Sequence, residues 1–319
     1  MKVSLITGAS GFAGGHLTRL LLHNNHDVFA TYQNDVDKST VDSDLSEAKW
    51  KELNLFDKVS LIKLLKESKP DCIFHLSGQS NVPLSWEYPI ETYNVNFFGT
   101  MNLLDAIIES GIDPKILVIC SGDEYGNVPV TRQPIKEEEP LKPINPYAVS
   151  KVCQDMVAYQ YFISKNLKII RVRPFPHIGM GQRPIFATPN FARQIALIES
   201  GKMEPVIKVG NLKAVRDYTD VRDIAKAYLL AIEKCDIGEV YNISSSRGVV
   251  INDVLDKLIS MSKKDVKIQI DQTLLRPIDI PYLVGDCSKF KNKTGWTPQI
   301  KLEETLQDLL DFWRFKVSS

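Results

Sequence analysis

A glycine-rich loop directly after the first apolar run constrains the fold of this chain most strongly. The run 3–7 (VSLIT) predicts a buried strand, and the segment 16–23 has leucines at helical spacing. Between them, Gly8 permits a tight turn, Gly11 lets a phosphate approach the backbone, and Gly14 allows close helix–strand contact. A strand, a glycine loop and a helix in this order predict a dinucleotide-binding unit, although the spacing is GxxGxxG rather than GxGxxG. Helix packing alone is the alternative explanation for the glycines.

Short apolar runs alternate with helical patterns through residue 172. Further strands are predicted at 27–31, 71–77, 115–121 and 167–172, and helices at 59–65, 97–109 and 147–162. Such alternation requires crossover connections, which are right-handed and place helices on both faces of a parallel sheet. The predicted fold class is therefore α/β, a Rossmann-type doubly wound parallel sheet.

Prolines and glycines concentrate between residues 174 and 184, where the pattern changes. Beyond this loop, short strands are mixed with helices predicted at 190–199, 221–233, 251–260 and 302–315. The sequence thus predicts a dinucleotide-binding domain over 1–173, to which 210–245 returns. Residues 174–209 and 246–319 are predicted to form a smaller α/β C-terminal substrate lobe.

Charge and composition exclude several classes of function. The chain has 39 basic and 39 acidic residues, so it lacks the long-range attraction of a nucleic-acid or acidic-membrane binder. Its apolar runs are too short to span a bilayer. Its five cysteines form no CxxC pair and its five histidines are dispersed, so we expect no metal site and no disulfide framework. Scattered thiols and the absence of a signal-peptide pattern predict a cytoplasmic protein.

The end of the second predicted strand bears on the choice between NAD(H) and NADP(H). An acid there binds ribose hydroxyls, whereas an arginine accepts a 2′-phosphate. The chain has TYQN at 31–34, which is neither, and Asp35 and Asp37 come slightly late. Without an acid to repel a 2′-phosphate, the sequence favours NADP(H), with NAD(H) as the alternative.

Tyr147 and Lys151 begin the long predicted helix at i, i+4 spacing, so they face the same way. A nearby ammonium lowers the pKa of a phenol and readies it for proton transfer. Ser121 ends a strand expected beside this helix, and its hydroxyl is placed to hydrogen-bond a carbonyl or alkoxide. The three residues predict proton transfer coupled to hydride transfer by a nicotinamide cofactor. An exposed tyrosine beside a solvated lysine is the alternative.

Eight stretches carry a resemblance to a known family. They are TGASGFAG (7–14), HLSGQSNV (75–82), NVNFFGTMNLL (94–104), SGDEYG (121–126), NPYAVSK (145–151), RPFPHIGMGQ (173–182), VRDYTDVRD (215–223) and GEVYNISS (238–245). Almost end to end, the chain resembles the extended short-chain dehydrogenases/reductases that act on nucleotide sugars, the NAD-dependent epimerase/dehydratase family. Within it, RPFPHIGMGQ, NFARQIA (190–196) and LLRPIDIPYLVGDCSKFKNKTGW (274–296) are most similar to GDP-6-deoxy-4-keto-D-mannose reductases, and are shared in part with GDP-mannose 4,6-dehydratases.

The resemblance implies a set of cofactor-binding positions. They are Gly8, Gly11, Phe12, Ala13, Gly14, Asn54, Leu55, Leu76, Ser77, Gly78, Tyr147 and Lys151. It also makes Tyr147 the general acid, with Ser121 as its hydrogen-bond partner, Lys151 as the residue that tunes its pKa, and Asp123 as a further catalytic position. Asn54 stands where the family often has Asp.

The resemblance likewise implies substrate-binding positions. They are Ser80, Asn96, His177, Arg183, Asn190, Arg216 and Arg276. Asn96 is also a candidate member of a proton relay. Arg216 is expected to bind the substrate diphosphate, because a planar guanidinium matches phosphate oxygens. A salt bridge to Asp217 or Asp220 is the alternative role. Pro176 replaces an Asn that usually contacts the substrate.

The segment after Ser121 distinguishes the possible reactions. Dehydratases need a base and an acid close to the catalytic hydroxyl, but here an Asp (Asp123) occupies the usual Glu position and Glu124 is shifted by one residue. On a strand exit, that shift turns a side chain to the other face. We therefore expect NAD(P)H-dependent reduction of the 4-keto group of a nucleotide-linked 6-deoxyhexose, GDP-4-keto-6-deoxy-D-mannose to GDP-D-rhamnose. A nucleotide-sugar 4-epimerase, a GDP-mannose 4,6-dehydratase and a redox-sensing protein without catalysis are the alternatives.

The helices over 94–109 and 147–162 resemble those that form a four-helix dimer interface in the family. Their apolar positions include Leu103, Ile107, Met156, Tyr159 and Phe162. These side chains either form a homodimer interface or cover the sheet, and the resemblance favours the homodimer.

Overall fold

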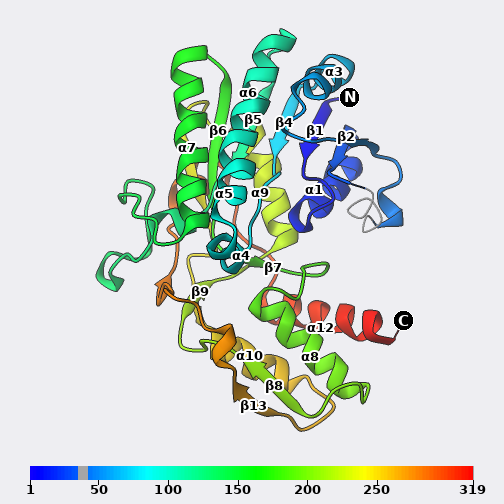
Figure 1. Cartoon of the computed structure of the whole chain (residues 1–319), viewed down its shortest axis with the longest axis vertical. Coiled ribbons are helices and arrows are strands. Elements are labelled where there is room, and N and C mark those ends of the chain that lie inside the picture. The colour runs from blue at the N-terminus through cyan, green and yellow to red at the C-terminus, as the bar shows by residue number, and fades with distance from the viewer. Residues whose placement is uncertain (35–41, 319) are drawn as a thin grey trace.

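A seven-stranded parallel sheet forms the centre of the molecule, as Figure 1 shows for this computed structural model, which describes residues 1–34 and 42–318. Its strand order is β3-β2-β1-β4-β5-β6-β11. The strands are β1 (Val3–Thr7), β2 (Asp27–Tyr32), β3 (Lys49–Glu52), β4 (Cys72–His75), β5 (Lys115–Ile119), β6 (Lys168–Pro174) and β11 (Val240–Ile243). The order reverses between β1 and β4, which opens a crevice at the carboxyl ends of the strands. The predicted doubly wound fold is confirmed.

Helices cover both faces of the sheet. One face carries α1 (Phe12–His23), α9 (Val221–Lys234) and α11 (Ser288–Thr294), and the other carries α3 (Lys58–Ser68), α6 (Gly99–Ser110) and α7 (Pro146–Lys165). Leu17 and Leu21 of α1 are fully buried against the first face. Complete burial of such a side chain contributes roughly 2 kcal/mol, so this helical spacing of leucines fixes α1 on the sheet.

A smaller lobe lies beyond the carboxyl ends of the strands (Figure 1). Its core is formed by α8 (Ala187–Glu199), α10 (Ile251–Ser260) and α12 (Leu302–Ser318) around the two-stranded sheet of β8 (Val206–Val209) and β13 (Lys267–Ile270). Two further small sheets pair β7 (His177–Ile178) with β10 (Thr219–Asp220), and β9 (Val215–Asp217) with β12 (Gly248–Val250) and β14 (Tyr282–Leu283). The short helices are α4 (Val82–Glu87), α5 (Pro89–Tyr93), η1 (Ser43–Leu45), η2 (Asn94–Phe98), η3 (Gly122–Tyr125), η4 (Val130–Arg132) and η5 (Gln272–Leu274).

The chain crosses between sheet and lobe at positions that differ slightly from the predicted boundaries. Within 210–245, β11 is a strand of the central sheet and α9 packs on that sheet. In contrast, β9 and β10 pair with strands of the lobe. Helix α11, which the sequence placed in the lobe, packs on the sheet because Phe290 and Trp296 are buried with α9.

Two local features were not predicted. Strand β3 is a sheet edge with the sequence KWKE, whose charged residues are typical of a protected edge and hide the strand pattern. A π-helical turn, η2, precedes α6, so the helix predicted from residue 97 begins as a wider turn at Asn94. Across the described residues, we find no helix with the length and apolar character needed to cross a bilayer.

Candidate active site

The glycine loop lies at the crevice between β1 and β4. Gly8 has φ +74°, and a Cβ there would lie 2.7 Å from the Ser77 backbone nitrogen. A Cβ on Gly14 would lie 2.3 Å from the Gly8 carbonyl oxygen. Gly11 precedes the first turn of α1, whose amides no side chain caps. Gly8 and Gly14 thus allow backbone segments to pack closely at this crevice, and the uncapped first-turn amides of α1 suit a pyrophosphate.

The residues expected near the adenosine contact different parts of the protein. Thr31 accepts a hydrogen bond from the Gly8 amide at 3.1 Å, which ties the end of β2 to the loop. Asn54 accepts from the Phe56 amide at 2.9 Å, and Leu55 is buried. Asp35 and Asp37 lie outside the described residues.

Gly78 lies between the glycine loop and α7, the helix that carries Tyr147 and Lys151. It follows β4 after Leu76 and Ser77, and a Cβ on it would lie 2.9 Å from Asn96 Oδ1 and 3.6 Å from Lys151 Nζ. The structure therefore brings Gly78, a predicted cofactor position after β4, next to Lys151, while Gly8 after β1 contacts Ser77 of the same loop.

Tyr147 lies in the first turn of α7, beside the end of β5. Asn145 caps this helix by accepting from the Ala148 amide at 2.7 Å, and Pro146 fixes its first residue. The phenol of Tyr147 is hydrogen-bonded to Ser121. Burial raises the pKa of Tyr147, and the negative charge of Asp123 raises it further, against the opposing hydrogen bond from Ser121. The protein's own groups hold this tyrosine protonated.

Burial raises the pKa of Tyr147 instead of the expected lowering, and the tuning of this pKa by Lys151 stays a prediction. The ammonium of Lys151 has other partners. Its Nζ donates to the Ile119 carbonyl at 2.8 Å and to Gln154 Oε1 at 2.6 Å. The opposing cause is burial, which raises the pKa of Tyr147 and lowers that of Lys151. The i, i+4 spacing placed both residues correctly on one side of α7 but did not show what each contacts.

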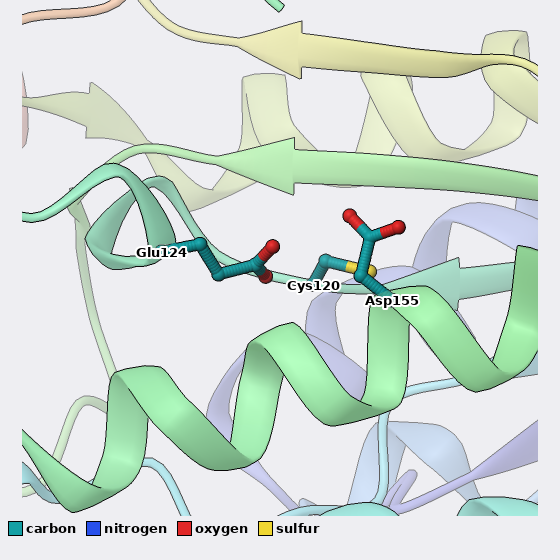
Figure 2. A group of neighbouring side chains, drawn as sticks. All are labelled: Cys120, Glu124 and Asp155. Carbon is teal, nitrogen blue, oxygen red and sulfur yellow. The ribbon is translucent and has the colours of Figure 1, made fainter. Parts of the chain in front are cut away.

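Asp123 and Glu124 point in different directions. The segment after Ser121 is the short helical turn η3, not the extended strand exit that was predicted. Glu124 accepts from the Ser121 amide at 2.8 Å and extends towards Asp155 of α7 (Figure 2). It does not line the cavity described below. Asp123 borders that cavity instead, and burial raises its pKa. The predicted difference in orientation between the two carboxylates is thus present.

The cluster of Cys120, Glu124 and Asp155 in Figure 2 has the donor atoms of a metal site. However, Arg173 contacts both carboxylates, at 3.3 Å from Glu124 and 2.8 Å from Asp155, and Arg171 lies 2.6 Å from Asp155. Two arginines already supply the positive charge that these buried carboxylates need, so the cluster is an ion-pair network.

A cavity lies between Asp123 and the lobe. Its lining consists of Asp123, Ile144, Asn145, Arg216, Arg276, Ile278, Asp279, Ile280 and Leu283. Nη2 of Arg216 lies 2.8 Å from Asp279 Oδ1, while Nη1 donates to the carbonyls of Val215 and Ile280. Arg276 lies 3.8 Å from the same Asp279 oxygen.

The acidic partner of Arg216 is neither Asp217 nor Asp220, so both predicted alternatives were wrong. Asp217 accepts from Ser245 and Gly285, and Asp220 pairs with Arg222. The reason is that Arg216 on β9 faces the segment before β14, where Asp279 lies.

The other predicted substrate residues do not line this cavity. Ser80 and Arg183 are exposed, and Asn190 is half-buried on α8. His177 stacks on Phe12 with ring centroids 5.9 Å apart, so it joins the glycine loop to the lobe.

Asn96 is buried and its side chain is fully used. It accepts from the Gln79 amide at 2.8 Å and donates to Gln79 O and Ser150 Oγ. These contacts hold the loop after β4 against α7, in place of the predicted contact with substrate.

Two residues of this region were missed from the sequence. Asp279 follows Arg276 at i, i+3, and this charge pair was a usable signal. Gln154 follows Lys151 at i, i+3, but a glutamine on a helix carries no such signal.

Comparison with known proteins agrees with this geometry. The family model described as GDP-mannose 4,6 dehydratase matches residues 5–309. GDP-6-deoxy-D-mannose reductase of Pseudomonas aeruginosa is 32% identical, over 98% of this chain and 97% of that protein. GDP-6-deoxy-D-talose 4-dehydrogenase of Aggregatibacter actinomycetemcomitans is 30% identical over 92% of each.

A solved structure, that of RMD from Pseudomonas aeruginosa complexed with NADPH, has a TM-score of 0.88 and 31% identity, covering 99% of this chain and 100% of that one. The glycine loop, the Ser121–Tyr147 pair and these similarities point the same way. The chain belongs to the GDP-mannose 4,6-dehydratase family of extended short-chain dehydrogenases/reductases.

Proposed function

We propose that this protein is an NAD(P)H-dependent oxidoreductase that reduces the 4-keto group of a nucleotide-linked 6-deoxyhexose. The proposed reaction converts GDP-4-keto-6-deoxy-D-mannose to GDP-D-rhamnose. The observation that carries it is Tyr147, hydrogen-bonded to Ser121 in the first turn of α7, the turn whose cap Asn145 lines the arginine-containing cavity together with Asp123. Similarity to a GDP-6-deoxy-D-mannose reductase supports the same substrate.

The residues present fit a nicotinamide dinucleotide. The space that a Cβ on Gly8 or Gly14 would fill is needed by backbone here, and the uncapped first turn of α1 suits a pyrophosphate. In this proposal the domain over 1–173 holds the cofactor through Gly8, Gly11–Gly14, Asn54, Leu55 and Leu76–Gly78. When bound, the reduced nicotinamide supplies a hydride. Lys151 is placed to hold its ribose.

Tyr147 is the acid of the proposed reaction. A keto oxygen that gains a hydride at its carbon becomes an alkoxide and needs one proton. Tyr147 supplies that proton from its hydroxyl, and Ser121 donates a hydrogen bond to the same oxygen. A tyrosine is protonated at neutral pH, so Tyr147 can give this proton directly.

Arg216 and Arg276 bind the diphosphate in this proposal. Both guanidinium groups line the cavity, and both lie near a single carboxylate, Asp279. Phosphate oxygens would replace or join that carboxylate as partners of the arginines. Ser80, His177, Arg183 and Asn190 stay candidate contacts for the sugar and base.

Dehydration is the second candidate, because the matching family model is that of a dehydratase and Asp123 is a half-buried carboxyl near Tyr147. Glu124, the other carboxyl of the segment, pairs with Arg173 and Asp155. A single free carboxyl favours reduction over a reaction that needs both an acid and a base.

The test is to incubate the purified protein with GDP-4-keto-6-deoxy-D-mannose and either NADPH or NADH. We expect loss of nicotinamide absorbance and formation of a GDP-6-deoxyhexose, faster with NADPH. Conversion of GDP-mannose to its 4-keto-6-deoxy derivative, or epimerisation without net oxidation of the cofactor, would overturn the proposal.

We further propose that the protein is a homodimer that works in the cytoplasm. Leu103 and Ile107 are buried under the sheet, but Met156, Tyr159 and Ile163 are exposed on α7. Ile163→Lys should halve the mass measured by light scattering, whereas Ile270→Lys, equally exposed on lobe strand β13, should not.

Unpaired cysteines, mostly buried, support a reducing compartment.

A further inference from the structure

A buried chain of hydrogen bonds ends at Lys151. It runs from Thr7 Oγ1 to His75 Nδ1 at 2.7 Å and from His75 Nε2 to Thr100 Oγ1 at 2.9 Å. Gln154 Nε2 donates to Thr100 Oγ1 at 3.0 Å, and Gln154 Oε1 accepts from Lys151 Nζ at 2.6 Å. All five side chains are buried. The chain therefore joins the end of β1, where the glycine loop starts, to the catalytic helix.

The donors and acceptors of this chain allow one arrangement. The Thr100 hydroxyl donates to the Asn96 carbonyl at 2.7 Å, so its oxygen accepts from both Gln154 and His75. His75 then carries its proton on Nε2 and accepts from Thr7 at Nδ1. Burial lowers the pKa of His75 to about 3, which keeps the ring neutral. A neutral imidazole and an amide carry no charge through the chain, so its role is to fix orientation.

The ammonium of Lys151 has three donors, and two of them bond to residues within 1–34 and 42–318. One bonds to Gln154 and one to the carbonyl of Ile119, at the end of β5. The ammonium lies beside Gly78, where a Cβ would be 3.6 Å away. The two fixed bonds leave one N–H for a ligand.

We propose that Gln154 is a positioning residue that orients the Lys151 ammonium in the active site, and that Thr100 and His75 fix the amide of Gln154. This inference rests on the proposed function, since it assigns Lys151 a role in turnover. It extends the site to three buried side chains, Gln154, Thr100 and His75, which are linked to Lys151 by hydrogen bonds.

The pH dependence of the reaction gives a readout that a purely structural role would not move. The titratable groups that face Lys151 are Cys120 and Glu124 from the β5–η3 segment and His75 from β4, with Tyr147 and Asp155 on its own helix. The pKa of Lys151 is lowered and that of Tyr147 is raised, so Lys151 loses its proton first as the pH rises. The alkaline limb of the rate profile should report Lys151.

Two substitutions of Gln154 should move this limb in opposite directions. Gln154→Met removes an acceptor from the ammonium, so the limb moves to lower pH and kcat falls about tenfold. Gln154→Glu places a carboxylate beside the ammonium, so the limb moves to higher pH, by roughly one pH unit. Gln160→Met is the matched control, because Gln160 lies on the same helix and is exposed. It should leave the profile unchanged.

Substitutions of Thr100 test the second link. Thr100→Val removes the hydroxyl that fixes the amide while Gln154 remains, so kcat should fall about threefold with a smaller shift to lower pH. Thr100→Ser keeps the hydroxyl and should restore wild-type behaviour.

Equal or same-direction shifts in Gln154→Met and Gln154→Glu would overturn the inference, as would wild-type activity in Gln154→Met. Failure of the proposed function is distinguishable, because the wild-type protein would then not turn over the 4-keto sugar. In that case the pH dependence of NADPH affinity, followed by nicotinamide fluorescence, still reports Lys151. Opposite shifts of that dependence in the two variants support the inference, and unchanged dependence overturns it.

Discussion

The two halves of the active site are built in different ways. The glycine loop and the start of α7 each come from one continuous segment, so local spacing fixes Gly8 against Gly14 and Tyr147 against Lys151. The cavity around Arg216 is assembled from η3, the turn before α7, β9 and the segment through β14. We call the glycine loop and the start of α7 the local half, and the cavity around Arg216 the lobe half. The comparison shows that the local half is determined by short sequence segments, whereas the lobe half depends on long-range packing.

Removing the phenolic hydroxyl should produce the largest effect. Tyr147→Phe deletes the proposed proton donor, so kcat should fall by about 10³-fold while the affinity for NADPH stays within about twofold. Steady-state kinetics and a fluorescence titration would measure both. Tyr159→Phe, on an exposed part of α7, is the control and should remain fully active. Substantial turnover by Tyr147→Phe would show that Tyr147 is not the proton donor.

The lobe half should respond to removal of a single arginine. Arg216→Ala should raise the KM for the sugar nucleotide by about 10²-fold, because a charge-assisted contact to a diphosphate is lost. NADPH affinity should not change, since Arg216 lies in the lobe-side cavity. Arg193→Ala removes an exposed arginine of α8 and should leave KM within a few fold. Equal effects of the two variants would show that this cavity does not bind the diphosphate.

Two glycines in α1 test how tightly the local half is packed. Gly14→Ala places a Cβ 2.3 Å from the Gly8 carbonyl oxygen, which should lower the free energy of unfolding by about 1–3 kcal/mol and weaken NADPH binding. Gly15→Ala meets no atom closer than 3.9 Å, so it should be neutral or stabilise by about 0.5–1 kcal/mol. Denaturant unfolding would measure both. Destabilisation by Gly15→Ala to the same degree would contradict the packing described for Gly14.

The halves should also differ in how pH affects stability. Burial lowers the pKa of His75 from 6.5 to about 3, so the unfolded chain binds the extra proton and stability is lost as the pH falls through this range. Burial raises the pKa of Asp217 from 3.8 to about 6, so its contribution to stability is lost as the pH rises from about 4 to 6.

Each slope should disappear with its residue. His75→Gln should remove the first, by up to about 5 kcal/mol, and Asp217→Asn the second, by up to about 3 kcal/mol, in unfolding experiments across pH 3–7. If the free energy of unfolding still changes with pH in the same way in these variants, other titratable groups are responsible.

The sequence was sufficient for the fold class because strands and helices alternate with strong apolar periodicity. It was not sufficient for β3, whose lysines obscure an edge strand. Within the site, local spacing predicted Tyr147, Lys151 and the glycines. It could not predict that Lys151 contacts Ile119, because this contact depends on how α7 lies against β5. The contact with Gln154 lies within α7, but many side chains at this spacing do not bond to each other.

The lobe was harder to predict for the same physical reason. Arg216 was identified, but its partner Asp279 is 63 residues away in the chain and is brought close by the pairing of β9 with β14. Ser80 and Arg183 resemble family positions in sequence, yet their surroundings depend on loops whose path no local pattern determines.

Transfer of deuterium from labelled cofactor is the most direct test of the proposed reaction. The wild-type protein would be given GDP-4-keto-6-deoxy-D-mannose with NADPH deuterated on one face of C4 of the nicotinamide, and the product would be analysed by mass spectrometry and NMR. With the label on the transferred face, we predict one deuterium at C4 of the GDP-6-deoxyhexose for each cofactor oxidised, and none with the opposite label. A product without deuterium from either labelled cofactor, or formed without net oxidation, would contradict the account.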